Sequence, residues 1–293
     1  EALGGVLTDK ATVTQMLIAE EMAYGDLGMA VALLTPVNAL NAITRWGTAA
    51  QQEQYIPAFL DEQQPLNAVI AINEPSPLFD PFTLATQAEK NGNKYTLNGV
   101  KATVPLVNSA ELFLVAANVE GEGPALFLVD SSAEGLEVET QNAMGLRPAA
   151  MGNIKLKNVE INADARLGDD TFDYATLISY ARLGWCALAV GTAKAILDEV
   201  IPYANERIAF GEPISNRQSV AFMIANIRIE MDSMKILMER AAALAEQGKP
   251  FQREAYLAAV ACQEYAMNIG TDGVQLFGGI GFMRDFPAER WYR

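Results

Sequence analysis

Three long stretches in the last two fifths of the chain restrict its fold more than any other feature. Residues 173–207, 219–247 and 251–276 each carry apolar side chains at i, i+3 and i+4 spacing, which is typical of amphipathic helices. Because each such helix needs a partner for its apolar face, the pattern predicts a bundle of long helices. The breaks between them carry helix-ending residues, Gly211 with Pro213 and Gly248 with Pro250.

Residues from Thr8 to about Gln63 also have helical periodicity. Thr8 or Asp9 can cap a first helix, a second helical stretch lies near residues 37–46, and Thr48 can cap a third after Gly47. We therefore expect helices ahead of the remaining chain. Their predicted apolar faces are Val13, Met16, Leu17 and Met22 on the first helix, and Tyr55, Phe59 and Leu60 on the third.

Between about Asn67 and Ile161, short β-type runs separated by turn residues replace the helical pattern. Several short strands at this spacing predict a small sandwich or barrel. The expected strands are 68–72, 95–97, 112–115, 126–129 and 154–159, and the expected turns are at Asn91-Gly-Asn93, Asn98-Gly99 and Gly121-Glu-Gly-Pro124.

These regions predict an α+β protein of three domains. N-terminal helices occupy residues 1–66, a β domain 67–165 and a long-helix bundle 166–293. Both ends are expected to be cut from a longer chain, because the sequence opens at Glu1 and stops at Arg293 without a helix-ending residue.

Composition excludes several classes of protein. With 36 acidic and 21 basic residues the formal charge is −15, which would repel nucleic-acid phosphates and anionic lipid headgroups, so we expect no nucleic-acid partner. The absence of histidine excludes a Ser-His-Asp hydrolase, His-ligated zinc and imidazole-held haem. Cys186 and Cys262 lie in apolar stretches, which predicts buried, reduced thiols and no metal site. We expect no membrane span, because no unbroken apolar run reaches roughly 18 residues.

Taken from the residues alone, the candidate sites are ambiguous. Gly278-Gly-Ile-Gly281 follows a helix rather than a strand, so a glycine helix cap explains it as well as a dinucleotide fingerprint does. Gln275 before it could bond a ligand or only the capped carbonyls. Glu74 in Asn73-Glu-Pro75 could simply face solvent, and Arg207 ends a helix, where the dipole favours any cation.

The order of these motifs over essentially the whole chain resembles that of the acyl-CoA dehydrogenase family. No one motif decides the resemblance, which depends on their common order. The motifs are Gly4-Gly5, Glu20-Glu21, Gly47-x-x-x-Gln51, Asn73-Glu-Pro-x-x-x-x-Asp80, Tyr95-x-Leu-Asn-Gly-x-Lys101, Met144-Gly-Leu-Arg147, Arg207-x-x-Phe-Gly-x-Pro-Ile, Gln218, Asp272-x-x-Gln-x-x-Gly-Gly-x-Gly-Phe and Pro287-x-Glu-Arg.

The resemblance implies an FAD-dependent oxidoreductase of fatty acid metabolism, with the family's helix–β–helix fold. Such an enzyme removes two hydrogens across the α–β bond of an acyl-CoA or acyl-carrier-protein thioester: a carboxylate takes the α-proton and flavin N5 accepts the β-hydride. The flavin lies between the β domain and the C-terminal bundle, and a neighbouring subunit holds its adenine half. Electron-transferring flavoprotein is the implied electron acceptor. A homo-dimer or tetramer, or a hetero-oligomer with a homologous subunit, is the implied assembly, in the bacterial cytoplasm or the mitochondrial matrix.

The resemblance also assigns roles to residues. Arg207 would meet an FAD phosphate, and the glycines after Gln275 would let FAD approach the backbone closely. The cofactor-binding candidates are Ile72, Asn73, Arg207, Phe210, Arg217, Gln218, Gln275, Gly278 and Gly279, and the substrate-binding candidates are Phe79 and Arg182.

Several positions depart from the family pattern. Asn73 replaces a Thr, Phe79 replaces the Ser of Gly-Ser-Asp, and Thr103 and Pro105 replace a Trp and a Thr that face the flavin. A second hypothesis is therefore a subunit that lends the Arg207 half of a flavin site to a homologous subunit while its own β-domain half is degraded. A third, weaker one is another flavin-dependent oxidation, such as hydroxylation.

No residue of the sequence can be assigned as the catalytic base. Much of the family carries it in a Tyr-Glu-Gly-Thr segment just beyond the Arg that matches Arg293, so the base is expected there. A minority place a Glu just before the Arg that matches Arg182, where this chain has Ala181. Asp285 and Glu289 match structural positions of the family.

Overall fold

The computed structural model of the protein describes residues 11–169 and 171–293. The described chain divides into a helical unit, which comprises the residues up to Ala30 together with Ile178–Arg293, and a β unit, Val31–Leu177. Gly4-Gly5 and the predicted cap at Thr8 or Asp9 lie outside the described residues. The three predicted domain boundaries, at 1–66, 67–165 and 166–293, stay a prediction.

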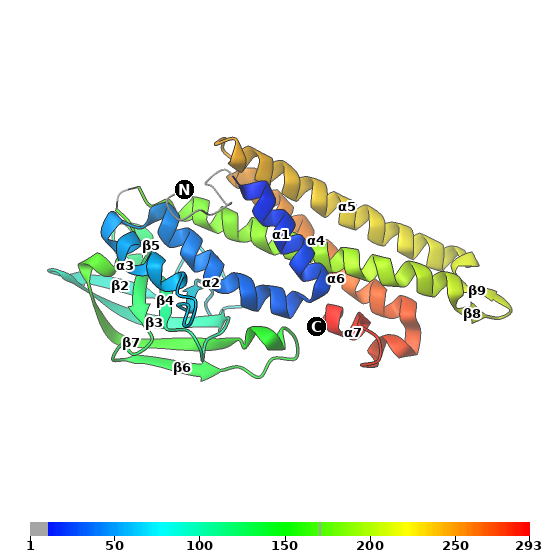
Figure 1. Ribbon diagram of the computed structural model, residues 1–293, viewed down its shortest axis with the longest axis horizontal. Coiled ribbons are helices and arrows are strands. Elements are labelled where there is room, and N and C mark those ends of the chain that lie inside the picture. Colours follow the sequence, from blue (N-terminus) through cyan, green and yellow to red (C-terminus); the bar gives the residue numbers. More distant parts are fainter. Residues whose placement is uncertain (1–10, 170) are drawn as a thin grey trace. The chain divides into compact units, whose positions relative to one another are not determined.

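Three long helices dominate the helical unit (Figure 1). They are α4 (Tyr174–Glu206), α5 (Gln218–Glu246) and α6 (Gln252–Phe277), each within one residue of its predicted bounds. Two ring contacts fix the direction of α4 against α6: Tyr180 meets Phe251 at 4.9 Å near both N-terminal ends, and Tyr203 meets Phe277 at 4.7 Å near both C-terminal ends. The two helices therefore run parallel. Shorter elements complete the unit: β8 (Ile208–Ala209), β9 (Glu212–Pro213) and α7 (Ala288–Tyr292).

Helix α1 (Thr12–Gly25) is held to the long helices by polar side chains as well as by packing. Its Val13 N–H donates to the Glu246 carboxylate of α5 at 2.9 Å, and Glu20 pairs with Lys235 of α5 at 2.7 Å. A Cβ added at Gly191 of α4 would lie 2.0 Å from the Glu20 carbonyl oxygen, so only glycine allows this close approach.

The predicted apolar face of this helix was only partly right. Met16 is buried, but Leu17 is exposed, and Glu20 occupies a buried position. The error has a physical cause, because the buried stripe of α1 contains a charged residue whose partner, Lys235, lies more than two hundred residues away in the chain.

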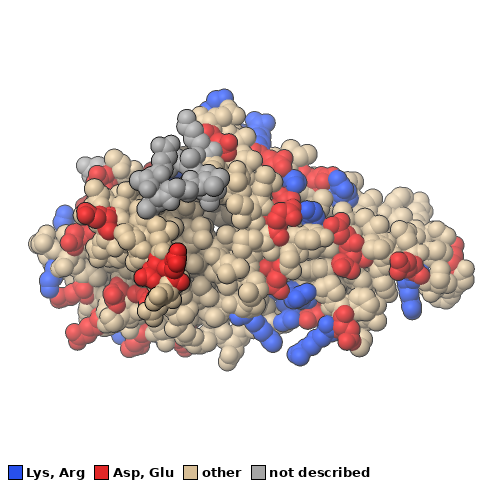
Figure 2. Space-filling model, viewed as in Figure 1, with Lys and Arg blue, Asp and Glu red and all other residues tan. Residues whose placement is uncertain are grey.

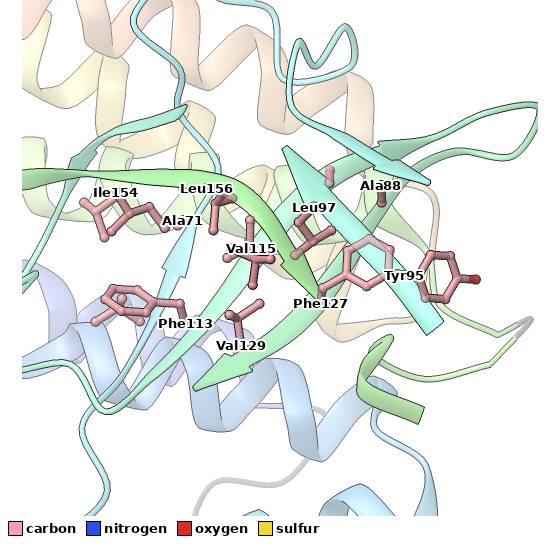
Figure 3. Packing of buried hydrophobic residues seen from close by; sticks show 14 of the residues in the cluster. Ala71, Ala88, Tyr95, Leu97, Phe113, Val115, Phe127, Val129, Ile154 and Leu156 are labelled. Atoms are coloured by element: carbon pink, nitrogen blue, oxygen red, sulfur yellow. The ribbon is translucent and has the colours of Figure 1, made fainter. Parts of the chain in front are cut away.

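A sheet of seven strands forms the core of the β unit as far as the structure describes it. Its order is β1-β4-β2-β3-β7-β6, with β5 paired along the other edge of β4; β1 and β2 run parallel to β4, and the other pairs are antiparallel. Figure 3 shows Phe113, Val115, Phe127 and Leu156 packed in the core of this sheet. The strands are β1 (Ala68–Ala71), β2 (Gln87–Asn91), β3 (Lys94–Val104), β4 (Leu112–Val119), β5 (Gly123–Asp130), β6 (Leu136–Thr140) and β7 (Gly152–Asn162).

Two predictions for the first half of the chain were wrong. Asn98-Gly99 is not a turn but a bulge inside β3, where the register against β7 shifts. The helix predicted near residues 37–46 begins ten residues earlier, as α2 (Leu27–Trp46), and continues through Pro36. Asp26 caps its start by accepting the Met29 N–H at 2.9 Å. By contrast, α3 (Ala49–Phe59) carries the predicted Thr48 cap, within a capping box with Gln51.

Helix α2 is also, by length and composition alone, apolar enough to cross a membrane. The prediction of no span considered only unbroken apolar runs and so passed over this helix, whose polar residues include Thr35 and Asn38. Core helices of globular proteins meet the same criterion, so α2 is weak evidence for a span.

Candidate functional site

The polar residues that follow β1 and end β3 form a connected group in the β unit, here called the strand-end cluster: Asn73, Glu74, Lys101 and Thr103. At its centre, Lys101 Nζ lies 2.8 Å from Glu74 Oε1 and 3.0 Å from the Ile72 carbonyl oxygen. Lys101 is 0% exposed and Glu74 8% exposed. The possibility that Glu74 faces solvent is therefore corrected: the pair is buried and joins two strands.

The surroundings of this pair keep both groups charged at neutral pH. Burial disfavours ionisation of Glu74, but hydrogen bonds from Lys101 and from the backbone amides of Ala85 and Thr86 outweigh it and lower the pKa of Glu74. Burial lowers the pKa of Lys101 to about 8, against the opposing effect of Glu74. Both pKa values are lowered, but the consequences differ: the lower pKa of Glu74 reflects a stabilised carboxylate that accepts three hydrogen bonds, whereas the lower pKa of Lys101 reflects the burial of its ammonium.

Asn73 and Thr103 make up the exposed side of the cluster. Asn73 Nδ2 donates to Thr103 Oγ1 at 3.1 Å, and the Ala102 N–H donates to the Asn73 carbonyl at 2.9 Å. Thr103 has a φ of 52°, in the left-handed region that a β-branched residue seldom adopts. The structure thus joins two of the positions at which the sequence departs from the family pattern.

Phe79 lies in the loop between β1 and β2 and is half-buried. Asp80 next to it closes a turn by accepting the Phe82 N–H at 3.0 Å. Tyr174 donates its hydroxyl to the Pro81 carbonyl at 2.9 Å, and its pKa is raised by burial and by the charges of Glu74 and Asp80, so it stays a neutral donor. The loop is therefore held in place directly after Phe79.

In the helical unit, the structure brings Phe210 and Arg217 together. Phe210 lies at the tip of the β8–β9 hairpin, is 95% exposed and has a φ of 57°. The Arg217 guanidinium lies 5.4 Å from the centre of its ring and also pairs with Glu212 at 3.3 Å. Arg207 just after α4 and Gln218 at the start of α5 are both exposed.

The glycines after α6 lie at the same end of the helical unit as Arg207. Tyr203, one turn before Arg207, donates its hydroxyl to the carbonyl of Phe277, the residue before Gly278. Gly278 has a φ of 63°, and a Cβ added at Gly278 or Gly279 would meet no described atom within 4 Å. Gln275 is exposed in the last turn of α6. An exposed backbone and an exposed cation thus occur together here.

Arg182 lies elsewhere in this unit, towards the beginning of α4. It is half-buried, and its guanidinium lies 5.0 Å from the ring centre of Tyr256 on α6. Near the other end of α6, Asp285 is exposed, whereas Glu289 is engaged by both the Nε and an Nη atom of Arg293. A carboxylate held in this way is a poor candidate for a base.

Lys101 is the residue of this site that sequence reasoning undervalued. It lies in a motif that the sequence showed, yet no role was assigned to it. Its signal was a charge in an inward-facing position of a strand whose other inward residues, Tyr95 and Leu97, are apolar. A charge there needs a buried partner.

Comparison with known proteins identifies the family to which these features belong. The models of the N-terminal, middle and C-terminal domains of acyl-CoA dehydrogenases match residues 1–63, 69–159 and 174–293. The short/branched chain specific acyl-CoA dehydrogenase of rat (Rattus norvegicus) mitochondria is 30% identical over 98% of this chain and 68% of its own length. The chain belongs to the acyl-CoA dehydrogenase family. It is thus related to flavoprotein oxidoreductases of fatty acid metabolism, and the predicted fold class is confirmed.

Two solved acyl-CoA dehydrogenase-like structures show how far the likeness extends. Butyryl-CoA dehydrogenase from Megasphaera elsdenii has a TM-score of 0.82 and 27% identity, over 94% of this chain and 74% of that one. The prolyl acyl carrier protein oxidase AnaB has a TM-score of 0.85 and 27% identity, over 96% of this chain and 77% of that one. These relatives act on different acyl carriers, so the acyl-CoA dehydrogenase fold alone does not decide the carrier.

The candidate residues fit the FAD of acyl-CoA dehydrogenases. Arg207 and Arg217 are exposed cations on a chain of formal charge −15, and a diphosphate needs such cations. The open space beside Gly278 and Gly279 leaves backbone accessible to a ligand. Asn73 presents an exposed amide that can bond to a polar ring edge.

Proposed function

We propose that this protein is an FAD-dependent dehydrogenase that removes two hydrogens across the Cα–Cβ bond of an acyl thioester. The observation that carries the proposal is the end of the helical unit where Arg207, Gly278 and Gly279 are all exposed. A chain as acidic as this one would repel a phosphate. At this end of the helical unit, however, it carries an exposed cation and accessible backbone, which can bind one.

FAD, when bound, supplies the hydride acceptor of this reaction. The residues proposed to hold it act in different ways. Arg207 meets a phosphate through charge-assisted hydrogen bonds, Phe210 packs against the cofactor, and Arg217 and Gln218 lie along it. The amide of Gln275 and the backbone of Gly278 and Gly279 face the cofactor. At the flavin edge lie Ile72, which follows β1, and the side-chain amide of Asn73.

The proposed substrate contacts are Arg182 and Phe79. The Arg182 guanidinium already has one face against Tyr256, so its orientation is set before substrate arrives. Phe79 fills a position where the family carries a small hydroxyl, and the held loop keeps it from moving aside. We therefore propose that Phe79 shortens or redirects the acyl pocket.

The catalytic base is proposed to lie C-terminal to Arg293, as in much of the family. Position 181, the alternative, is Ala, and Glu289 is occupied by Arg293. The proposed electron acceptor is electron-transferring flavoprotein, and the proposed location is the bacterial cytoplasm or the mitochondrial matrix. The proposal includes both CoA and an acyl carrier protein as the group that carries the acyl chain.

The visible spectrum of the purified complete polypeptide tests this function. A flavin spectrum that bleaches on anaerobic addition of saturated acyl-CoA thioesters of graded length is the expected result. Arg207→Met should weaken FAD binding at least about tenfold, because a charge-assisted hydrogen bond is lost. Arg253→Met, at another exposed arginine, on α6, should leave FAD binding unchanged. Full flavin binding without any bleaching would contradict a dehydrogenase.

A second candidate function is favoured by one observation in the β unit. The Thr103 hydroxyl donates to the Ala102 carbonyl, and Pro105 has no backbone N–H. In the family both positions carry groups that face the flavin, and both groups are missing here. A subunit of this kind would lend its Arg207 end to a homologous subunit. It would be colourless when purified alone and yellow only when co-expressed with that subunit.

A further inference from the structure

Asn73 and Thr103 are tied to each other and to the backbone on both sides. Besides the bond from Asn73 Nδ2 at 3.1 Å, Thr103 Oγ1 lies 2.7 Å from the Ala102 carbonyl oxygen. The Ala102 N–H in turn donates to the Asn73 carbonyl at 2.9 Å. Together with the intervening backbone, these hydrogen bonds form a closed ring between the end of β1 and the end of β3.

Counting hydrogens in this ring determines the orientation of the Asn73 amide. A threonine hydroxyl has a single hydrogen, and here it goes to the Ala102 carbonyl. The atom of Asn73 that faces Thr103 Oγ1 must therefore be a donor, which is Nδ2. Its carbonyl oxygen, Oδ1, then points away from Thr103 and remains an acceptor on an exposed side chain.

The backbone at Thr103 shows that this arrangement is strongly held. A β-branched residue at a φ of 52° is strained, and such strain persists only where neighbouring contacts enforce it. Two residues earlier, the buried ammonium of Lys101 bonds both Glu74 and the Ile72 carbonyl and so ties this part of β3 to the segment after β1. Strained residues fixed in this way are frequent at ligand sites.

We infer that Thr103 is a positioning residue that orients Asn73 so that Oδ1 accepts the ring N–H of the flavin pyrimidine. The inference rests on the proposed function and adds to it separate roles for the two residues: Asn73 binds the flavin, and Thr103 orients Asn73. Thr103 has no hydrogen left to donate to a flavin, so its contribution passes through Asn73. The two departures from the family pattern are then one joint replacement rather than two separate losses.

A double-mutant cycle on FAD affinity tests this coupling. Thr103→Val removes the hydroxyl at constant shape, and Asn73→Ala removes the amide; each should weaken FAD binding about fivefold to tenfold, as loss of one net hydrogen bond does. Asn73→Ala/Thr103→Val should bind no more weakly than Asn73→Ala alone. Thr103→Ser keeps the hydroxyl and should bind FAD like the wild type.

A flavin analogue supplies a second readout that is independent of activity. FAD methylated at the pyrimidine nitrogen has no N–H at that position, so the wild type should bind it about tenfold more weakly than FAD. Asn73→Ala should not distinguish the two flavins, because the acceptor is already gone.

The possible results separate this inference from the proposed function. A wild-type polypeptide that binds no FAD overturns the proposed function and this inference with it. Wild-type FAD binding with strictly additive losses in the cycle overturns the inference alone. The inference also fails if Thr103→Val lowers the thermal stability of the FAD-free protein while leaving its affinity for FAD unchanged, since Thr103 would then be structural only.

Discussion

Among single residues, Glu74 and Lys101 are the buried charged side chains of the described part of the β unit, and their burial carries an electrostatic cost. Removing two charges from water costs several kcal/mol for each ion, and only close pairing with further hydrogen bonds offsets that cost. The pair meets this condition, because Glu74 also accepts the amides of Ala85 and Thr86, and Lys101 also reaches the Ile72 carbonyl. The ends of β1 and β3 are thus joined by two charged groups, and removing either one alone leaves the other charge buried without its partner.

Lys101→Met should therefore destabilise the protein by about 3–5 kcal/mol, because it leaves a buried carboxylate without its cation. Adding Glu74→Gln should recover part of this loss, since the remaining amide is neutral. Lys155→Met, which breaks the solvent-exposed pair with Glu139, should cost far less, because water solvates both partners and screens their attraction. Urea unfolding measures all of these. Equal losses for Lys101→Met and Lys155→Met would contradict the buried pair.

Glu74 also makes stability depend on pH. Its pKa in the folded protein is below the ordinary value of 4.5, so the unfolded chain binds more protons in this range. The contribution of Glu74 is fully present above about pH 4.5 and is lost as pH falls through the folded-state pKa. Unfolding free energy should fall more steeply below pH 4.5 in the wild type than in Glu74→Gln. Parallel curves for the two proteins would show that Glu74 keeps an ordinary pKa.

What the sequence revealed at this scale depended on whether a residue's partner was local. The Thr48 cap was predictable, because its partner Gln51 is three residues away. The burial of Glu74 was not, because its partner Lys101 is 27 residues away, on β3. The link between Asn73 and Thr103 was hidden for the same reason.

Among the elements, strand β3 contains the feature that sequence patterns described least well. Asn-Gly usually marks a hairpin turn, yet at Gly99 the chain forms a bulge with a φ of 155° and continues as a strand. A Cβ at this position would lie 2.5 Å from Thr86 Oγ1 and 2.7 Å from Thr86 Cα. The close approach of Thr86, the residue just before β2, therefore requires glycine here.

Gly99→Ala should cost about 2–4 kcal/mol, because both the backbone conformation and the contact with Thr86 resist a side chain. Gly92→Ala is the matched control: Gly92 has a φ of 63° in the hairpin between β2 and β3, but a Cβ there would meet no described atom within 4 Å. It should cost only about 1 kcal/mol. Denaturant midpoints compare the two variants. A Gly99→Ala loss as small as that of Gly92→Ala would remove the steric argument.

Long helices were the most predictable elements because their periodicity repeats many times. The bounds of α4, α5 and α6 follow from repeated i, i+3 and i+4 spacing. Strands β2 and β6 were not predicted, since their residues are largely polar and exposed and their place depends on pairing with β3 and β7. Helix α2 is longer than predicted, because it continues through Pro36, a residue type that normally ends or kinks a helix.

At the scale of the whole molecule, an exposed row of apolar residues on α5 is the feature that bears on assembly. Phe222, Ile229 and Ile236 recur at seven-residue intervals and are 59%, 63% and 65% exposed. No charged residue occurs in Gln218–Ile227, and Figure 2 shows an uncharged surface over this first part of α5. Apolar residues at this spacing are typical of helices that pack against another helix.

We propose that a second copy of the chain covers this row, since one helix face at a twofold axis can meet itself. Ile229→Glu/Ile236→Glu should then shift the protein to a smaller mass in light scattering after gel filtration, because paired faces would bury like charges. The same variant should bind FAD more weakly if, as the family resemblance implies, the neighbouring subunit holds the adenine half.

Val138→Glu provides the control for this prediction, since Val138 is a single exposed apolar residue on β6. It should change neither mass nor FAD affinity. A wild-type protein that is already monomeric, or a double variant of unchanged mass, would contradict the paired face. Unchanged mass with weakened FAD binding would instead place α5 near the cofactor within one subunit. Mass and FAD affinity of these variants therefore distinguish two cases. In one, a second subunit completes the flavin site; in the other, one chain forms the site alone.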